Sequence, residues 1–167
     1  MNKHFETLAI RTQAEQTQHK EHAVPLYLTS SFTFDSAEEM RAAFADETDA
    51  NIYSRFSNPN ADEFAEKMAM LEGAEAGYAT ASGMGAVFAS FMTFLKSGDH
   101  LLVCRSIFGS THTIITKYLP KWGIAYSYFD ANKPESIEGL IQKNTKMIFV
   151  ETPSNPGVDV IDLELLG

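Results

Sequence analysis

The pattern of apolar and polar positions along the chain changes near residue 60. Before that point the sequence has no sustained period, whereas after it short apolar runs alternate with segments whose apolar residues recur every three or four positions. Short apolar runs favour strands, and the longer spacing favours helices. Strands that alternate with helices form parallel sheets through right-handed crossovers. We therefore predict an α/β fold with a mainly parallel sheet flanked by helices, preceded by an extended N-terminal arm.

The elements expected after residue 60 follow one another closely. Helices are predicted at 60–73, 83–96, 110–119 and 136–143, and strands at 77–82, 100–104, 124–129 and 147–151. Asn60 is the expected cap of the first helix, with Glu63 as its capping-box partner, and Pro120 is expected to end the third. The helix at 83–96 is apolar nearly all round, which predicts that it is buried. The final segment, 161–167, is typical of an interrupted helix.

The arm before residue 60 has little periodic structure. We expect a short helix near 5–16, an extended stretch at 24–32, and a helix that Ser36 caps and that runs through Phe44. The stretch 51–60 is polar, aromatic and rich in turn residues. Long segments of this kind tend to be functional or to pack on another subunit. The predicted division is an arm at 1–60 and an α/β domain at 61–167.

Composition removes several classes of function. The 13 basic and 22 acidic residues give a net charge of −9, which disfavours binding to nucleic acid and to anionic membranes. The apolar run at 86–95 is too short to span a bilayer, and the first 20 residues carry no signal-peptide core, so the cytoplasm is the default location. One cysteine excludes an intrachain disulfide, and the five histidines show no ligand spacing. We expect no metal.

Two groups of residues could hold a phosphate. Ser82, Gly83 and Met84 lie between a predicted strand and an apolar helix, where glycine permits close approach and the helix N-terminus favours an anion. A tight turn without a ligand would show the same residues. Tyr53 and Arg55 form the second group, because guanidinium binds phosphate in a bidentate manner and a tyrosine hydroxyl adds a donor. An exposed turn with a solvated arginine is the alternative.

Three further candidates follow predicted strands. Phe108 could stack on a planar ring, and Glu151 and Asn155 offer polar groups at the carboxyl edge of the sheet, where ligands of α/β folds bind. A core phenylalanine and a structural turn are the alternatives for these positions.

The order of these motifs resembles that of the pyridoxal-phosphate enzymes of cysteine and methionine metabolism, which include homoserine-ester sulfhydrylases, methionine lyases, and cystathionine synthases and lyases. The resemblance covers nearly the whole chain. It rests on Pro25-Leu-Tyr-Leu-Thr-Ser-Ser-Phe32, Tyr53-Ser-Arg55 with Asn58-Pro59, Ala81-Ser-Gly-Met84, Phe108-Gly109 and Glu151-Thr-Pro-Ser-Asn-Pro156.

The resemblance implies a role for each candidate. Ser82 and the N–H groups of Gly83 and Met84 would bind the phosphate of pyridoxal 5′-phosphate, and Phe108 would stack on its ring. Asn155 would bond near the ring hydroxyl and place the substrate carboxylate, with support from Glu151. Tyr53 and Arg55 would reach the phosphate of a neighbouring subunit, Tyr53 also contacting substrate, so the site is expected in a dimer-built homotetramer.

The sequence departs from the family pattern at several points. The family usually has tyrosine where Phe108 stands and threonine where Asn60 stands; we expect Asn60 to be an equivalent helix cap. The Schiff-base lysine, the aspartate that pairs with the ring nitrogen and a C-terminal arginine are expected beyond Gly167. No catalytic residue is therefore expected within the 167 residues, which would be an inactive truncated portion of a longer protein.

The family implies an enzyme of methionine biosynthesis. Phe108 favours the branch that replaces the γ-ester of O-succinyl- or O-acetylhomoserine with sulfide to give homocysteine. The alternative within the family is a γ-lyase acting on methionine or cystathionine. An alternative of another class is a catalytically inactive module that associates with a related subunit.

Overall fold

The computed structural model describes residues 4–11 and 15–166. The chain forms two compact units, residues 1–79 and 80–167. By its contacts the helix that begins near residue 60 belongs to the first unit. The functional division predicted at residue 60 concerns what each segment gives to a neighbouring subunit, and it stays a prediction.

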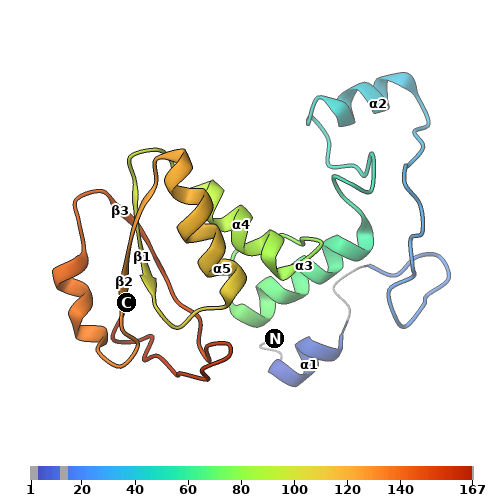
Figure 1. The fold of residues 1–167 in the computed structure, drawn as a ribbon. Coiled ribbons are helices and arrows are strands. Elements are labelled where there is room, and N and C mark those ends of the chain that lie inside the picture. The colour runs from blue at the N-terminus through green and yellow to red at the C-terminus, as the bar shows by residue number, and fades with distance from the viewer. Residues whose placement is uncertain (1–3, 12–14, 167) are drawn as a thin grey trace. The chain divides into compact units, whose positions relative to one another are not determined.

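The second unit is built on three parallel strands, as the sequence predicts (Figure 1). They are β1 (His100–Cys104), β2 (Ala125–Phe129) and β3 (Thr145–Phe149). Their order is β2-β1-β3, so the first strand in sequence is the central one. The third strand ends two residues earlier than predicted, which leaves Glu151 in the loop that follows it.

Burial on both faces defines the central strand. Leu101 and Val103 pack in a cluster with Phe91 of the preceding helix, whereas Leu102 and Cys104 pack in a second cluster on the opposite face. All five residues of β1 are buried. A strand covered on both faces needs an unbroken apolar run, and this explains why the sequence signal at 100–104 is so clear.

Helical segments cover the two faces of this sheet (Figure 1). They are α4 (Gly83–Phe94), α5 (Gly109–Thr113), the π-helical η1 (Ile114–Tyr118), the 3-10 helix η2 (Leu119–Trp122) and the 3-10 helix η3 (Pro134–Leu140). The run from α5 to η2 is continuous. The prediction that Pro120 ends this run is wrong, because proline fits within the first turn of η2. The run ends at Gly123, whose φ is +74°.

Four other predictions for this part of the chain differ from the structure. Residues 77–82 do not form a strand, because they have no ladder partner within the described chain. The helix expected at 136–143 is the 3-10 helix η3, and in place of the helix expected from residue 161 the chain forms a turn at residues 164–166. Helix α4 buries only one face: Phe91 is fully buried, whereas Phe94 is 66% exposed.

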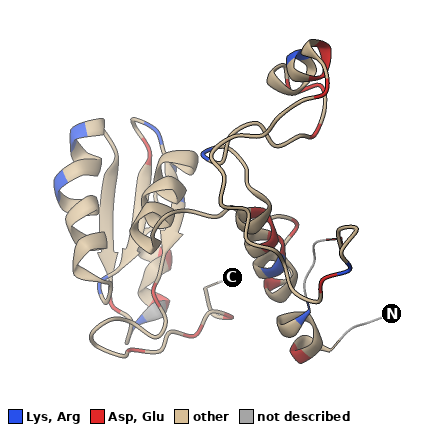
Figure 2. Ribbon diagram, turned by 90° about the vertical axis from the view of Figure 1, so that its right-hand side faces the viewer, with Lys and Arg blue, Asp and Glu red and all other residues tan. Residues whose placement is uncertain are grey.

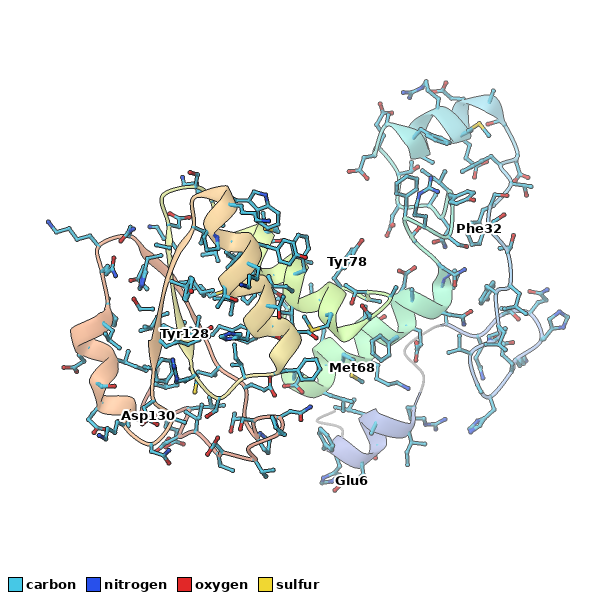
Figure 3. The ribbon with its side chains drawn as sticks, viewed as in Figure 1. Glu6, Phe32, Met68, Tyr78, Tyr128 and Asp130 are labelled. Atoms are coloured by element: carbon cyan, nitrogen blue, oxygen red, sulfur yellow. The ribbon has the colours of Figure 1, made fainter. Side chains whose placement is uncertain are left out.

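The first unit contains α1 (Phe5–Ile10), α2 (Ala37–Phe44) and α3 (Pro59–Glu72). Helix α1 is shorter than predicted, and part of the expected 5–16 helix lies outside the described residues. Helix α2 begins as predicted, with the Ser36 hydroxyl accepting from the Glu39 N–H at 3.1 Å. Phe32 faces α2 (Figure 3) and lines an apolar pocket with Met40 and Phe44.

The start of helix α3 differs from the prediction. Asn58, not Asn60, is the N-cap, with its side chain accepting from the Asn60 N–H at 2.9 Å and Pro59 in the first helical position. Proline is favoured there because its missing N–H is not needed. Gly73 ends the helix with φ +65°, as predicted.

Charge is unevenly distributed over the helices. Helices α2 and α3 carry most of their charge as Asp and Glu, whereas α4 carries no charged residue (Figure 2). Within the described residues, no helix is long and apolar enough to cross a membrane.

His100 joins the three strands at the start of the sheet. Its imidazole is 1% exposed, with Nδ1 at 2.8 Å from the Thr145 hydroxyl of β3 and Nε2 at 3.0 Å from the Ser127 hydroxyl of β2. Burial lowers the pKa of His100, because the charged form loses its hydration.

We predict that this histidine makes stability depend on pH. The unfolded chain gains a proton at an ordinary histidine pKa of about 6.5, whereas the folded chain does so only at lower pH. The free energy of unfolding should therefore fall as the pH is lowered from about 6.5 towards the depressed folded pKa. Above a pH of about 6.5 this histidine should cause no further change. Denaturant titrations of His100→Leu should show a flatter pH dependence. The exposed His22→Gln should keep the wild-type slope; an unchanged slope in His100→Leu would contradict the assignment.

Candidate functional site

The six candidates of the second unit lie on loops that follow its strands and at the start of helix α4. Phe108 follows β1, and Glu151 and Asn155 follow β3, at the carboxyl edge of the parallel sheet. Met84, in the first turn of α4, contacts α5 through its sulfur, 3.9 Å from the Thr111 hydroxyl. Tyr53 and Arg55 lie in the first unit.

The N-terminus of α4 has the features of an anion site. The Ser82 hydroxyl accepts from the Gly85 N–H at 3.0 Å, so the N–H groups of Gly83 and Met84 precede the first intrahelical bond. The first turn holds no acidic residue. A Cβ built on Gly83 would meet no atom within 4 Å, so there is room beside these donors. The helix dipole favours a negative group at this position.

Glu151 ties the two loops of the rim together. One carboxylate oxygen accepts from the Phe108 N–H at 2.9 Å, and the other accepts from the Asn155 N–H at 2.6 Å. Phe108 and Glu151 are 43 residues apart in sequence. The carboxylate therefore fixes the spacing between a residue that could stack on a ring and one that could bond to its edge.

The loop that carries Asn155 is held by residues that the sequence reading missed. The buried Ser154 donates its N–H to the Asp159 carbonyl at 3.0 Å, and its hydroxyl accepts from the Asp159 N–H at 2.9 Å. The Thr152 hydroxyl accepts from the Ile161 N–H at 3.0 Å. Serine, threonine and aspartate that bond to nearby backbone are typical of such turns, and this was the signal available in the sequence.

Phe108 presents a ring that is 40% exposed and carries no polar group. One helical turn further along, His112 Nδ1 lies 2.8 Å from the Tyr128 hydroxyl of β2. Burial raises the pKa of Tyr128, as does the neighbouring Tyr126, while Arg105 lowers it to a smaller extent. Neither His112 nor Tyr128 was a sequence candidate.

Tyr53 and Arg55 occupy one turn of the first unit. The Arg55 guanidinium packs over the Tyr53 ring, 4.7 Å from its centroid, and lies 5.2 Å from that of Phe56. Among the described residues no carboxylate forms an ion pair with Arg55. A cation held in this way, without a fixed anion, is suited to bind a phosphate.

In the part of the chain that the structure describes, no group of three or more His, Cys, Asp or Glu side chains could hold a metal ion.

Comparison with known proteins identifies relatives along nearly the whole chain. The family model for "Cys/Met metabolism PLP-dependent enzyme" matches residues 6–166. The chain is 44% identical over 163 residues to an O-succinylhomoserine sulfhydrylase of Pseudomonas aeruginosa, covering 98% of this chain and 40% of that protein. It is 38% identical over 164 residues to an L-methionine gamma-lyase of Porphyromonas gingivalis, covering 98% and 41%.

Solved structures agree with these relatives. A protein of Campylobacter jejuni described as an O-acetylhomoserine (thiol)-lyase, with an N′-pyridoxyl-lysine-5′-monophosphate residue, matches with a TM-score of 0.91 and 34% identity, over 99% of this chain and 41% of that one. The metB protein of Corynebacterium glutamicum matches with a TM-score of 0.88 and 31% identity, over the same shares. The chain thus spans about 40% of the length of its curated relatives.

We predict that Glu151 controls the order of both rim loops. In Glu151→Gln an amide N–H₂ replaces one acceptor, so one of the two N–H groups faces a donor. Charge-assisted bonds of this kind contribute about 1.5–3 kcal/mol, so hydrogen exchange at the Phe108 and Asn155 amides should accelerate at least about tenfold. The exposed Glu138→Gln is the matched control and should leave both amides protected. Equal exchange in the two variants would show that the bridge does not order the rim.

Proposed function

We propose a function from the premise that this chain belongs to the family of Cys/Met metabolism PLP-dependent enzymes. The complete protein, in this proposal, exchanges the γ-ester of O-succinyl- or O-acetylhomoserine for sulfide. The products are homocysteine and succinate or acetate, so the step contributes to methionine biosynthesis. The observation that carries the choice of substrate is the 44% identity to an O-succinylhomoserine sulfhydrylase over 98% of this chain.

The residues of the second unit fit pyridoxal 5′-phosphate. The N–H groups of Gly83 and Met84 and the hydroxyl of Ser82 would bind the phosphate, because they stand at an open, uncharged helix N-terminus. Phe108 would cover the ring, and the Asn155 amide would bond to its edge and to the substrate carboxylate. When bound, the cofactor supplies an electron-withdrawing ring that stabilises negative charge developing on substrate carbons.

The remaining donors would come from a neighbouring subunit. Arg55 offers a bidentate fork to phosphate and Tyr53 a hydroxyl, which could also contact the substrate. A site divided in this way requires at least a dimer, and we propose a cytoplasmic homotetramer with an amino-acid substrate. The absence of a hydroxyl on Phe108 means that this side chain can stack and exclude water but cannot move a proton.

A γ-lyase acting on methionine or cystathionine is the second candidate. The 38% identity to an L-methionine gamma-lyase over 98% of this chain supports it. A third candidate, of a different class, is a non-catalytic module that pairs with a related subunit.

The substrate proposal predicts a clear preference in turnover. With the complete protein and pyridoxal 5′-phosphate, homocysteine should form from O-succinylhomoserine or O-acetylhomoserine and sulfide at a higher kcat/KM than that for release of methanethiol from methionine. The measurement is thiol product formation under matched conditions. A preference for methionine would select the lyase, and no turnover of either class would favour the non-catalytic module.

The two-subunit site predicts complementation between inactive variants. Arg55→Ala and Asn155→Ala should each lose most activity, because one lacks the donated cation and the other the amide of the receiving site. An equimolar, randomly reassembled mixture of the two variants should regain about one quarter of the wild-type activity, since about half of the dimers are mixed and each mixed dimer has one intact site of two. Absence of recovery in verified mixed dimers would show that Arg55 serves its own subunit.

A further inference from the structure

Two asparagine side chains at the start of α3 bind the extended segment of the arm. The Asn60 amide donates to the Pro25 carbonyl at 2.7 Å and accepts from the Tyr27 N–H at 2.8 Å. The Asn58 amide donates to the Tyr27 carbonyl at 3.2 Å. The partners lie 31 to 35 residues apart in sequence, so these bonds join segments that are distant along the chain.

The same network reaches the turn that carries the phosphate-binding candidates. The Asn58 amide also donates to the Ser54 hydroxyl at 3.0 Å, and that hydroxyl donates in turn to the Thr29 carbonyl. Ser54 stands between Tyr53 and Arg55. Backbone pairing continues the connection, with the Ser54 N–H donating to the Ser30 carbonyl at 2.9 Å.

The bonded groups form the pattern of a strand edge. Alternate residues of an extended chain direct their N–H and C=O groups to the same side, and Pro25, Tyr27 and Thr29 are alternate residues. Three side chains, those of Asn60, Asn58 and Ser54, occupy the place that a neighbouring strand would fill. An isolated bridge between Ser31 and Tyr53 then extends the pairing into ordinary antiparallel geometry.

We propose that Asn58 and Asn60 are positioning residues that hold the Tyr53–Arg55 turn in the orientation needed to reach a phosphate. The proposal rests on the proposed function. Arg55 and Tyr53 are both exposed and packed on one another, so their direction depends on how firmly the backbone of the turn is held. The hydrogen bonds made by residues 25–32 fix the backbone of the turn on one side, and α3 fixes it on the other.

Asn60 therefore has a different role from the one predicted from its sequence context. It was expected to cap α3, whereas it follows the cap and the first-position proline. At that position its side chain is free to pair with two backbone groups of the arm through two different atoms. A threonine would have to use one oxygen for both bonds, so the asparagine of this chain makes a tether that threonine cannot reproduce in the same geometry.

The test is Asn60→Ala in the complete protein. Alanine carries no charge, favours helix and leaves the Asn58 cap in place, so α3 should persist. Two bonds to the arm are lost. We expect the affinity for pyridoxal 5′-phosphate to fall about tenfold, and hydrogen exchange at the Tyr27 amide to accelerate. Asn132→Ala is the matched control, because its exposed side-chain amide donates to the nearby Asp130, is bonded to no other described residue, and lies in the second unit.

Binding of pyridoxal, which lacks the phosphate, separates positioning from general damage. Because Tyr53 and Arg55 act on the phosphate, Asn60→Ala should leave the affinity for pyridoxal unchanged. Equal losses for both ligands, or no loss for either, would overturn the inference while leaving the proposed function intact. Failure of the wild-type protein to bind pyridoxal 5′-phosphate would instead overturn the proposed function and the inference with it.

Discussion

Burial of β1 on both faces is the constraint on which the second unit depends. Leu102 and Cys104 contact one cluster while Leu101 and Val103 contact another, so a single short strand organises two layers of helical structure. Because β1 is the central strand, β2 and β3 must pair on either side of it, and all three then end at the same edge. The loops that carry Phe108, Glu151 and Asn155 lie at that edge as a consequence.

The polar contacts at this edge depend on that apolar framework. A carboxylate can bridge the Phe108 and Asn155 N–H groups only because the strands before them are held in fixed register. The Glu151 bridge places donors and an aromatic face beside one another without using the side chains of Phe108 or Asn155. Those side chains are left available for a ligand, which is the arrangement expected of a binding site supported by a second layer of contacts.

The first unit is held together mainly by polar contacts and not by an apolar core. Among its described residues the buried hydrophobics are the small side chains of Ala43 and Ala69. Its arm is held by side-chain amides and hydroxyls that substitute for a strand. Such polar contacts orient the arm more than they stabilise the fold of the first unit, because each hydrogen bond contributes only about 1 kcal/mol net. This suits a segment whose proposed task is to present Tyr53 and Arg55 to another subunit.

The sequence by itself determined the features that depend on neighbours along the chain. The apolar run at β1 and the Ser36 cap before α2 are local patterns, and the ordered motifs from Pro25 to Pro156 were enough to indicate the family. The tertiary structure decided the features that depend on distant partners. Asn60 bonds to the arm and does not cap α3, because the backbone of Pro25 and Tyr27 lies within reach. Glu151 binds the Phe108 N–H, 43 residues away, for the same reason. Periodicity and capping rules describe contacts within a few residues, whereas these pairings exist only once the chain has folded.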